Sequence, residues 1–191
     1  MSRPAKALRS PMQAKRWLWL VGHLFPPGQS TDAVTTTATF RVQPEHMWDN
    51  IVFYEDVEHP PPLLLRMFLP TPVRTDGGAK DVGTMVECTY AHGKLVKRIT
   101  EIDPPRLLRF DVVGQHLGIE RCITTLGGSY AIQPSGDHCE VALTTRYRAH
   151  LRPRWLWRSF ERLLAHQLHR HILAGMTATA RQSRRAEPAS R

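Results

Sequence analysis

The sequence predicts an α+β domain in which a curved antiparallel sheet of six or seven strands wraps around one long C-terminal helix, with short helices after the first strand. Several short segments alternate between apolar and polar residues and are separated by turns, which favours antiparallel strands. A single long segment near the C-terminus has helical periodicity. A sheet with one apolar face and one long helix must curl around that helix to bury it. The length of 191 residues suits one domain.

The first strand is predicted over residues 33–42, which are rich in threonine and valine and suit a half-buried ribbon. One parity of this segment is apolar: Val34, Ala38, Phe40 and Val42. Pro44 then begins a short helix, since proline is tolerated at a first helical position. Residues 59–72 are rich in proline and leucine and predict a short helix between two breaks, followed by a loop over 75–80.

Consecutive strands are predicted over residues 83–90, 94–103, 107–113, 119–134 and 139–149. The faces of the strand over 94–103 are ambiguous, because Leu95 and Ile99 compete with Val96 and Ile102 for the inner face. Gly127 and Gly128 predict a bulge or sharp bend.

The closing helix is predicted from about Pro153 to Met176. Its expected buried stripe contains Leu156, Phe160, Leu163, Leu164, Leu168 and Ile172.

Charge divides the chain into three parts, predicted as a basic N-terminal segment over 1–30, a folded domain over 31–176 and a disordered tail over 177–191. The net charge is +9, yet residues 1–30 hold five basic side chains and no acidic one, and the tail holds four arginines against Glu187. The folded domain is therefore nearly neutral, which argues against nucleic-acid binding.

No metal or cofactor is predicted. The three cysteines contain no C-x-x-C pair and are expected to act as small hydrophobic side chains in a reducing, cytoplasmic compartment. His166 and His169 share a helix face while His171 points elsewhere, so they lack a third ligand. No phosphate-binding loop, dinucleotide fingerprint or nucleophile elbow is present.

Residues 14–25 have one apolar helical face that carries Trp17 and Phe25, with Lys15 and Arg16 at its start. Such a helix can lie on an anionic membrane surface. The segment could equally pack on the domain or on another subunit, or act as a secretory signal. Its longest apolar run is far short of the roughly 20 residues that a membrane span needs.

Four segments in the expected order resemble the START-like superfamily of polyketide cyclases, lipid carriers and pollen allergens, also called SRPBCC. They are Pro44–Ile51 after the first strand, Ile99–Phe110, Gly127–Pro134 and the long closing helix. The resemblance covers residues 31–176 and implies a helix-grip fold with a cavity for a small apolar or amphipathic ligand. The prolines and leucines after Ile51 depart from the pattern.

Polar residues on the predicted inner face are the candidate ligand-binding residues. The sheet contributes Tyr90, Tyr130 and Tyr147, with Thr36 and Thr145, and the closing helix contributes Gln167 and His171. The alternative for each tyrosine is a core residue bonded to the backbone, and for His171 a histidine that favours a helix C-terminus.

Three functions remain open from the sequence. The first is non-catalytic binding or transport of a small hydrophobic or amphipathic ligand, lipid-like or polyketide-like, with membrane contact through residues 14–25. The second is a cyclase- or dehydratase-like enzyme, in which tyrosine and histidine act as acid and base. The third is an interaction scaffold with a filled core. The sequence shows no catalytic constellation, so binding is the preferred prediction, and it leaves the oligomeric state undefined.

Overall fold

The structure is a computed structural model that describes residues 30–53, 65, 68, 72–76, 81–90 and 93–186. Its elements follow one another in the order strand, helix, six strands and helix. They are β1 (Ser30–Phe40), α2 (Pro44–Phe53), β2 (Pro72–Asp76), β3 (Met85–Tyr90), β4 (Gly93–Asp103), β5 (Leu107–His116), β6 (Ile123–Ser135), β7 (His138–Ala149) and α4 (Arg154–Ala186).

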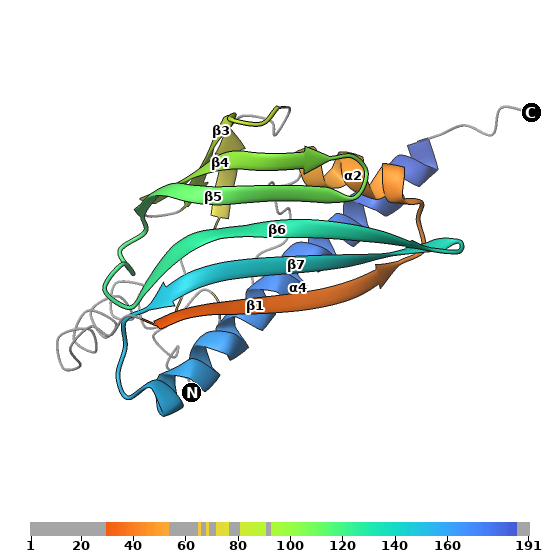
Figure 1. Cartoon of the computed structure of the whole chain (residues 1–191). Helices are drawn as coiled ribbons and strands as arrows, with labels where there is room; N and C mark the ends of the chain where they lie inside the picture. Colours follow the sequence, from red (N-terminus) through yellow and green to blue (C-terminus); the bar gives the residue numbers. More distant parts are fainter. Residues whose placement is uncertain are drawn as a thin grey trace, which may run out of the picture.

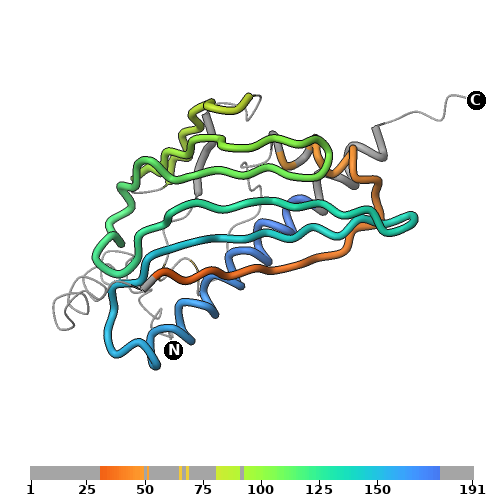
Figure 2. Tube along the Cα trace, in the orientation of Figure 1, coloured from red at the N-terminus to blue at the C-terminus, as the bar shows by residue number. Residues whose placement is uncertain are grey.

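The seven strands form one antiparallel sheet in the order β1-β7-β6-β5-β4-β3-β2. The sheet curves, and α4 crosses its inner face obliquely, with α2 beside the far part of the helix (Figure 1). The Cα trace shows β1 and the middle of α4 side by side (Figure 2). The predicted fold is confirmed: a helix-grip domain with a short helix after the first strand.

The strand faces follow the apolar parity of the sequence. In β1, Val34 and Phe40 are buried, and β1 pairs with β7 along its whole length. In β4, Leu95 and Ile99 are the buried pair, and two register shifts within the β4–β5 ladder explain why no single alternation was visible. The bulge predicted around Gly127 is present as a register shift between Thr125 and Gly127.

Helix α4 turns four of the six residues of its predicted stripe toward the sheet: Phe160, Leu164, Leu168 and Ile172. Leu156 and Leu163, expected in the buried stripe, are each 48% exposed, whereas Glu161 and His169 are buried. The helix is therefore rotated toward its polar flank relative to the prediction. Leucines at 163 and 164 made both flanks equally apolar, so the periodicity could not fix the direction of the stripe.

Two boundaries also need correction. Helix α4 continues through residues 177–186, which were expected to be a disordered tail. This segment is rich in alanine and arginine, which are strong helix formers. Strand β2 covers residues 72–76. The sequence predicted a short helix over 59–72 and a loop over 75–80 instead, because prolines dominate the segment before the strand. Residues 14–25 lie outside the described residues. Within the part of the chain that the structure describes, no helix is long and apolar enough to cross a membrane.

Candidate functional site

A cavity of about 200 Å³ lies between the inner face of the sheet and helix α4. One buried water needs only about 15 Å³ by the same measure, so the space exceeds that of a packing defect. The sheet supplies most of the wall, and α4 closes it. Its apolar lining residues are Phe68, Leu95, Phe110, Leu117, Ile119, Cys122, Ile123, Leu143, Leu151, Trp157, Phe160, Leu164, Ala165, Leu168 and Ile172.

The three tyrosines predicted as ligand-binding residues all line this cavity. Tyr90 comes from β3, Tyr130 from β6 and Tyr147 from β7, because each has the inward parity of its strand. Thr145, two residues before Tyr147, also reaches the cavity wall. The sheet therefore brings together side chains that are far apart in the sequence. Contact between any of them and a ligand stays a prediction.

Gln167 and His171 lie on α4 but are not among the residues that line the cavity. Both are partly buried on the flank of the helix. Glu161 and His169 are the polar residues of α4 that line the cavity, and ligand contact by Gln167 and His171 stays a prediction. Thr36, the remaining inward polar residue, belongs to the space between β1 and α4.

The hydroxyl of Tyr147 has an unusual position in this cavity. The side chain is 1% exposed, and its oxygen has no hydrogen-bond partner among the described residues. Burial, followed by the nearby charges of Glu161 and Asp32, raises the pKa of Tyr147 to about 12. The phenol is therefore protonated at neutral pH and can donate a hydrogen bond to a bound molecule.

An ionic cluster, formed by Asp32, Arg154, Arg158 and Glu161, lies where α4 begins. The two terminal nitrogens of Arg154 bond to the two carboxylate oxygens of Glu161 at 2.8 and 2.9 Å, and Arg154 Nη2 also lies 2.8 Å from Asp32 Oδ2. Arg158 Nε lies 3.1 Å from Asp32 Oδ1. The hydrogen bond from Arg154 to Glu161 raises the pKa of the guanidinium further. This pairing allows Glu161 to line an apolar cavity as a carboxylate.

A second polar set, the threonine–histidine chain, consists of Thr145, His169, Thr36 and His166. His169 is 1% exposed, and both of its ring nitrogens face hydroxyls: Nε2 lies 2.8 Å from Thr145 Oγ1 and Nδ1 lies 3.0 Å from Thr36 Oγ1. Burial, with a smaller contribution from His166, lowers the pKa of His169 to about 4. The imidazole is therefore neutral at physiological pH.

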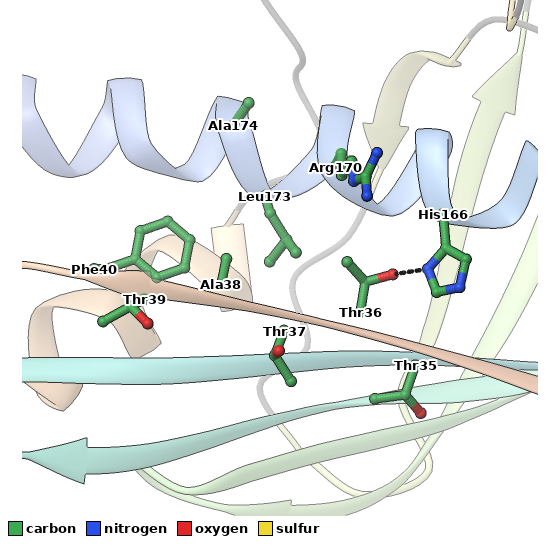
Figure 3. Close-up of a pocket in the computed structure, with 10 residues that line it drawn as sticks. All are labelled: Thr35, Thr36, Thr37, Ala38, Thr39, Phe40, His166, Arg170, Leu173 and Ala174. Carbon is green, nitrogen blue, oxygen red and sulfur yellow. Dashed lines mark hydrogen bonds between the residues drawn. The ribbon is translucent and has the colours of Figure 1, made fainter. Parts of the chain in front are cut away.

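The outer end of this chain opens into a groove between β1 and α4. Thr36 Oγ1 lies 2.8 Å from Nδ1 of His166, and the two side chains point toward each other across the groove (Figure 3). Arg170 and Leu173 line the same groove from the helix. His166 is only partly buried, so its ring has access to solvent.

Four polar residues of the cavity wall were not predicted from the sequence: Lys97, Thr125, Glu161 and His169. Lys97 has the same parity in β4 as Leu95 and Ile99, which was the available signal, and its ammonium lies 4.8 Å from the centre of the Phe110 ring. No comparable signal marks Glu161 or His169. His169 bonds to Thr36 of β1, 133 residues before it, and Glu161 bonds to Arg154, which itself reaches Asp32 of β1.

The other reactive groups among the described residues provide neither an activated thiol nor a metal site. Cys122 lines the cavity, but burial and the charges of Glu161 and Glu120 raise the pKa of its thiol to about 11, so it is not a nucleophilic thiolate at neutral pH. Among the residues that the structure describes, no three histidine, cysteine or carboxylate side chains gather as metal ligands would.

Comparison with known proteins supports the fold and nothing finer. Neither known protein families nor curated protein sequences give a match. Among solved structures, norcoclaurine synthase from Thalictrum flavum in complex with dopamine and hydroxybenzaldehyde is 13% identical with a TM-score of 0.55, covering 95% of this chain and 98% of that chain. The Zhui aromatase/cyclase from a Streptomyces species is 13% identical with a TM-score of 0.57, covering 84% and 99%. The helix-grip fold predicted from the sequence is thus confirmed.

Proposed function

We propose that this protein binds a small hydrophobic or amphipathic ligand, lipid-like or polyketide-like, in the cavity between the sheet and α4. The observation that carries the proposal is the buried hydroxyl of Tyr147, which lies in a largely apolar cavity and has no hydrogen-bond partner in the described part of the chain. A buried phenol without a partner costs about 1–3 kcal/mol, and a ligand oxygen would remove that cost. The cavity is also at odds with the alternative of a scaffold with a filled core.

The apolar wall would bind the body of the ligand, and the polar groups would fix its orientation. Tyr147 is the donor for a carbonyl or hydroxyl oxygen of the ligand, with Thr145 beside it on the same face of β7. Tyr90 and Tyr130 provide further phenols on the same inner wall. The carboxylate of Glu161 is held by Arg154 and disfavours an anionic group at that end.

Two neighbouring leucines of α4 allow a matched test. Leu164 lines the cavity, whereas Leu163 is 48% exposed on the outside of the same helix. Full-length protein, Leu164→Trp and Leu163→Trp are purified in parallel, extracted with organic solvent and analysed by mass spectrometry. We expect a small apolar compound from the wild type and from Leu163→Trp, and its loss from Leu164→Trp. Equal recovery from all three, or none from the wild type even after incubation with a total lipid extract, would reject the proposal.

A specific observation also favours a second function, an acid–base enzyme of the polyketide cyclase type. A neutral phenol at Tyr147 and a neutral imidazole at His169 line one cavity, and such groups can donate and accept protons at a carbonyl substrate. Incubating the recovered compound with the wild type and with Tyr147→Phe distinguishes the two functions. Catalysis predicts a product of changed mass or ultraviolet absorption in the wild type alone, and a carrier predicts an unchanged compound in both.

Membrane contact through residues 14–25 is part of the same proposal. Trp155 is 78% exposed in the first turn of α4, with exposed Arg152 just before it. The 2.8 Å contact between Arg154 and Asp32 joins this turn to β1, the first described strand. A tryptophan with basic neighbours is suited to a membrane interface. We expect cosedimentation with vesicles containing phosphatidylglycerol, and its loss in Trp155→Ser combined with deletion of residues 14–25. Equal cosedimentation of wild type and variant would contradict this.

A further inference from the structure

The hydrogen bonds of His169 continue, without interruption, from the cavity wall to the groove between β1 and α4. Thr145 lines the cavity, and His166 lines the groove. Three contacts of 2.8, 3.0 and 2.8 Å join Thr145 to His169, His169 to Thr36, and Thr36 to His166. Each member can both donate and accept a hydrogen bond. The residues come from three elements, α4, β1 and β7, that are adjacent in the fold.

The chemistry of the central hydroxyl fixes how this chain can be protonated. Thr36 has a single hydroxyl proton and faces two ring nitrogens, so it donates to one histidine and accepts from the other. His169 is neutral, so one of its nitrogens carries a proton and the other does not. All donors therefore point in one direction along the chain, either toward the cavity or toward the groove.

We infer that Thr145, His169, Thr36 and His166 form a proton relay between solvent in the groove and a ligand in the cavity. For inward transfer, a solvent proton binds Nε2 of His166, whose Nδ1 proton passes to Thr36. The proton of Thr36 passes to Nδ1 of His169, the Nε2 proton of His169 passes to Thr145, and the hydroxyl proton of Thr145 passes to the ligand. One proton enters and one leaves, and the same steps in reverse remove a proton from the ligand.

The surroundings of the relay favour transfer without a stable charge inside the protein. His169 is buried between Thr36 of β1 and Thr145 of β7, and burial disfavours its imidazolium form. Threonine hydroxyls do not hold a positive charge, so the protons must move together. Other titratable groups face the ends of the chain: Arg170 in the groove, and Tyr147, Glu161 and Lys97 in the cavity.

The inference rests on the proposed function and narrows its ligand class. A relay that ends at Thr145 requires a ligand atom that gains or loses a proton, such as the oxygen of a phenol, an enol or an enolisable carbonyl. A purely hydrocarbon ligand would have no use for it.

The rate at which the imidazole N–H of His169 exchanges with water tests the relay directly. It is measured by NMR on full-length protein with ¹⁵N-labelled histidine, and it needs no ligand. Thr36→Val keeps the shape of the side chain but removes the hydroxyl that joins the two histidines. Thr35→Val is the matched control, since the Thr35 hydroxyl bonds to Thr144 instead, at 2.8 Å. A relay predicts that Thr36→Val slows exchange at least about tenfold, because local opening becomes the remaining route, while Thr35→Val leaves it unchanged.

The direction of the change separates a relay from a structural network. Loss of a merely structural hydrogen bond loosens the packing around His169 and speeds exchange, so a faster or unchanged rate in Thr36→Val would overturn the inference. If Thr36→Val does not fold, His166→Phe removes the solvent end of the chain and must slow exchange in the same way. Failure here would leave ligand binding standing, and failure to find a ligand would leave the measured relay standing.

Discussion

Two polar clusters attach helix α4 to the sheet, and they accommodate buried polar atoms in opposite ways. The ionic cluster at the start of the helix holds two carboxylates on arginines. In the threonine–histidine chain, His169 lies about 12 Å beyond Glu161 along the helix, at a rise of roughly 1.5 Å per residue, and its buried imidazole is neutral. The ionic cluster fixes its charges in place, because each charge neutralises a neighbour. The threonine–histidine chain has no such fixed ion pairs, so its protons can change position along its hydrogen bonds.

The same comparison explains the state of Tyr147, which lies between the clusters. Tyr147 is paired in register with Asp32 of β1 and comes two residues after Thr145 in β7. The carboxylates of the ionic cluster disfavour a phenolate there. Burial is the main reason that the Tyr147 phenol stays protonated, and the carboxylates of the ionic cluster add to it.

The largest expected effect is the loss of the arginine of the ionic cluster. Arg154→Met leaves the buried Glu161 carboxylate without its arginine and leaves the partly buried Asp32 with Arg158 alone, so we expect the unfolding free energy to fall by about 3–5 kcal/mol. Urea denaturation at pH 7 measures it. Arg109→Met is the control, because its ion pair with Glu101 is about half exposed and should cost less than about 1 kcal/mol. Similar losses in both variants would show that burial of the cluster has no energetic consequence.

The next effect concerns pH and the neutral chain. The folded-state pKa of His169, about 4, lies below its ordinary value of 6.5, so the unfolded chain takes up a proton first as the pH falls. The contribution of His169 to stability is therefore complete above pH 6.5 and declines by roughly 3 kcal/mol by pH 4. Denaturation midpoints at pH 7, 5.5 and 4 should show this decline in the wild type and a smaller one in His169→Gln. The exposed His116→Gln serves as control, and equal pH dependence in all three would refute the prediction.

The sheet side of the site could be predicted from the sequence, and of the helix side only the apolar residues could be, not Glu161 and His169. An alternating strand has only two possible inner faces. The apolar face is the inner one in the strands that carry Tyr90, Tyr130 and Tyr147. A helix can turn through any angle, and the adjacent leucines at 163 and 164 gave no preference. Buried polar residues determine the rotation of the helix about its axis, and a pattern of apolar residues does not detect them.

Long-range pairing is the physical reason for this difference. His169 is stable inside the protein because Thr36 and Thr145 satisfy its nitrogens, and Thr36 lies 133 residues before it. Glu161 depends on Arg154 of its own helix and, through it, on Asp32. Read alone, each is a polar residue expected on the surface. Their burial follows only when the β1–β7 pairing has placed the partners.

The smallest expected effect on stability comes from removing two hydroxyls on the same face of β7. The hydroxyl of Thr145 bonds to His169, whereas that of Tyr147 has no partner among the described residues. Thr145→Val removes a partner from Nε2 of His169, so we expect a loss of about 1 kcal/mol. Tyr147→Phe removes a buried hydroxyl that has no partner among the described residues, so unfolding free energy should stay constant or rise by up to about 1 kcal/mol.

Binding should respond in the opposite sense to stability in Tyr147→Phe. The ligand loses its donor, and affinity for the compound recovered from the wild type should fall about tenfold, as expected for one lost hydrogen bond of roughly 1.4 kcal/mol. Thermal denaturation and equilibrium binding on the same samples measure both quantities. A variant that is more stable and binds more weakly identifies Tyr147 as a residue kept for its ligand. A loss of stability with unchanged binding would instead make the phenol a structural group of the core, and the donor to the ligand would have to be sought at Tyr90 or Tyr130.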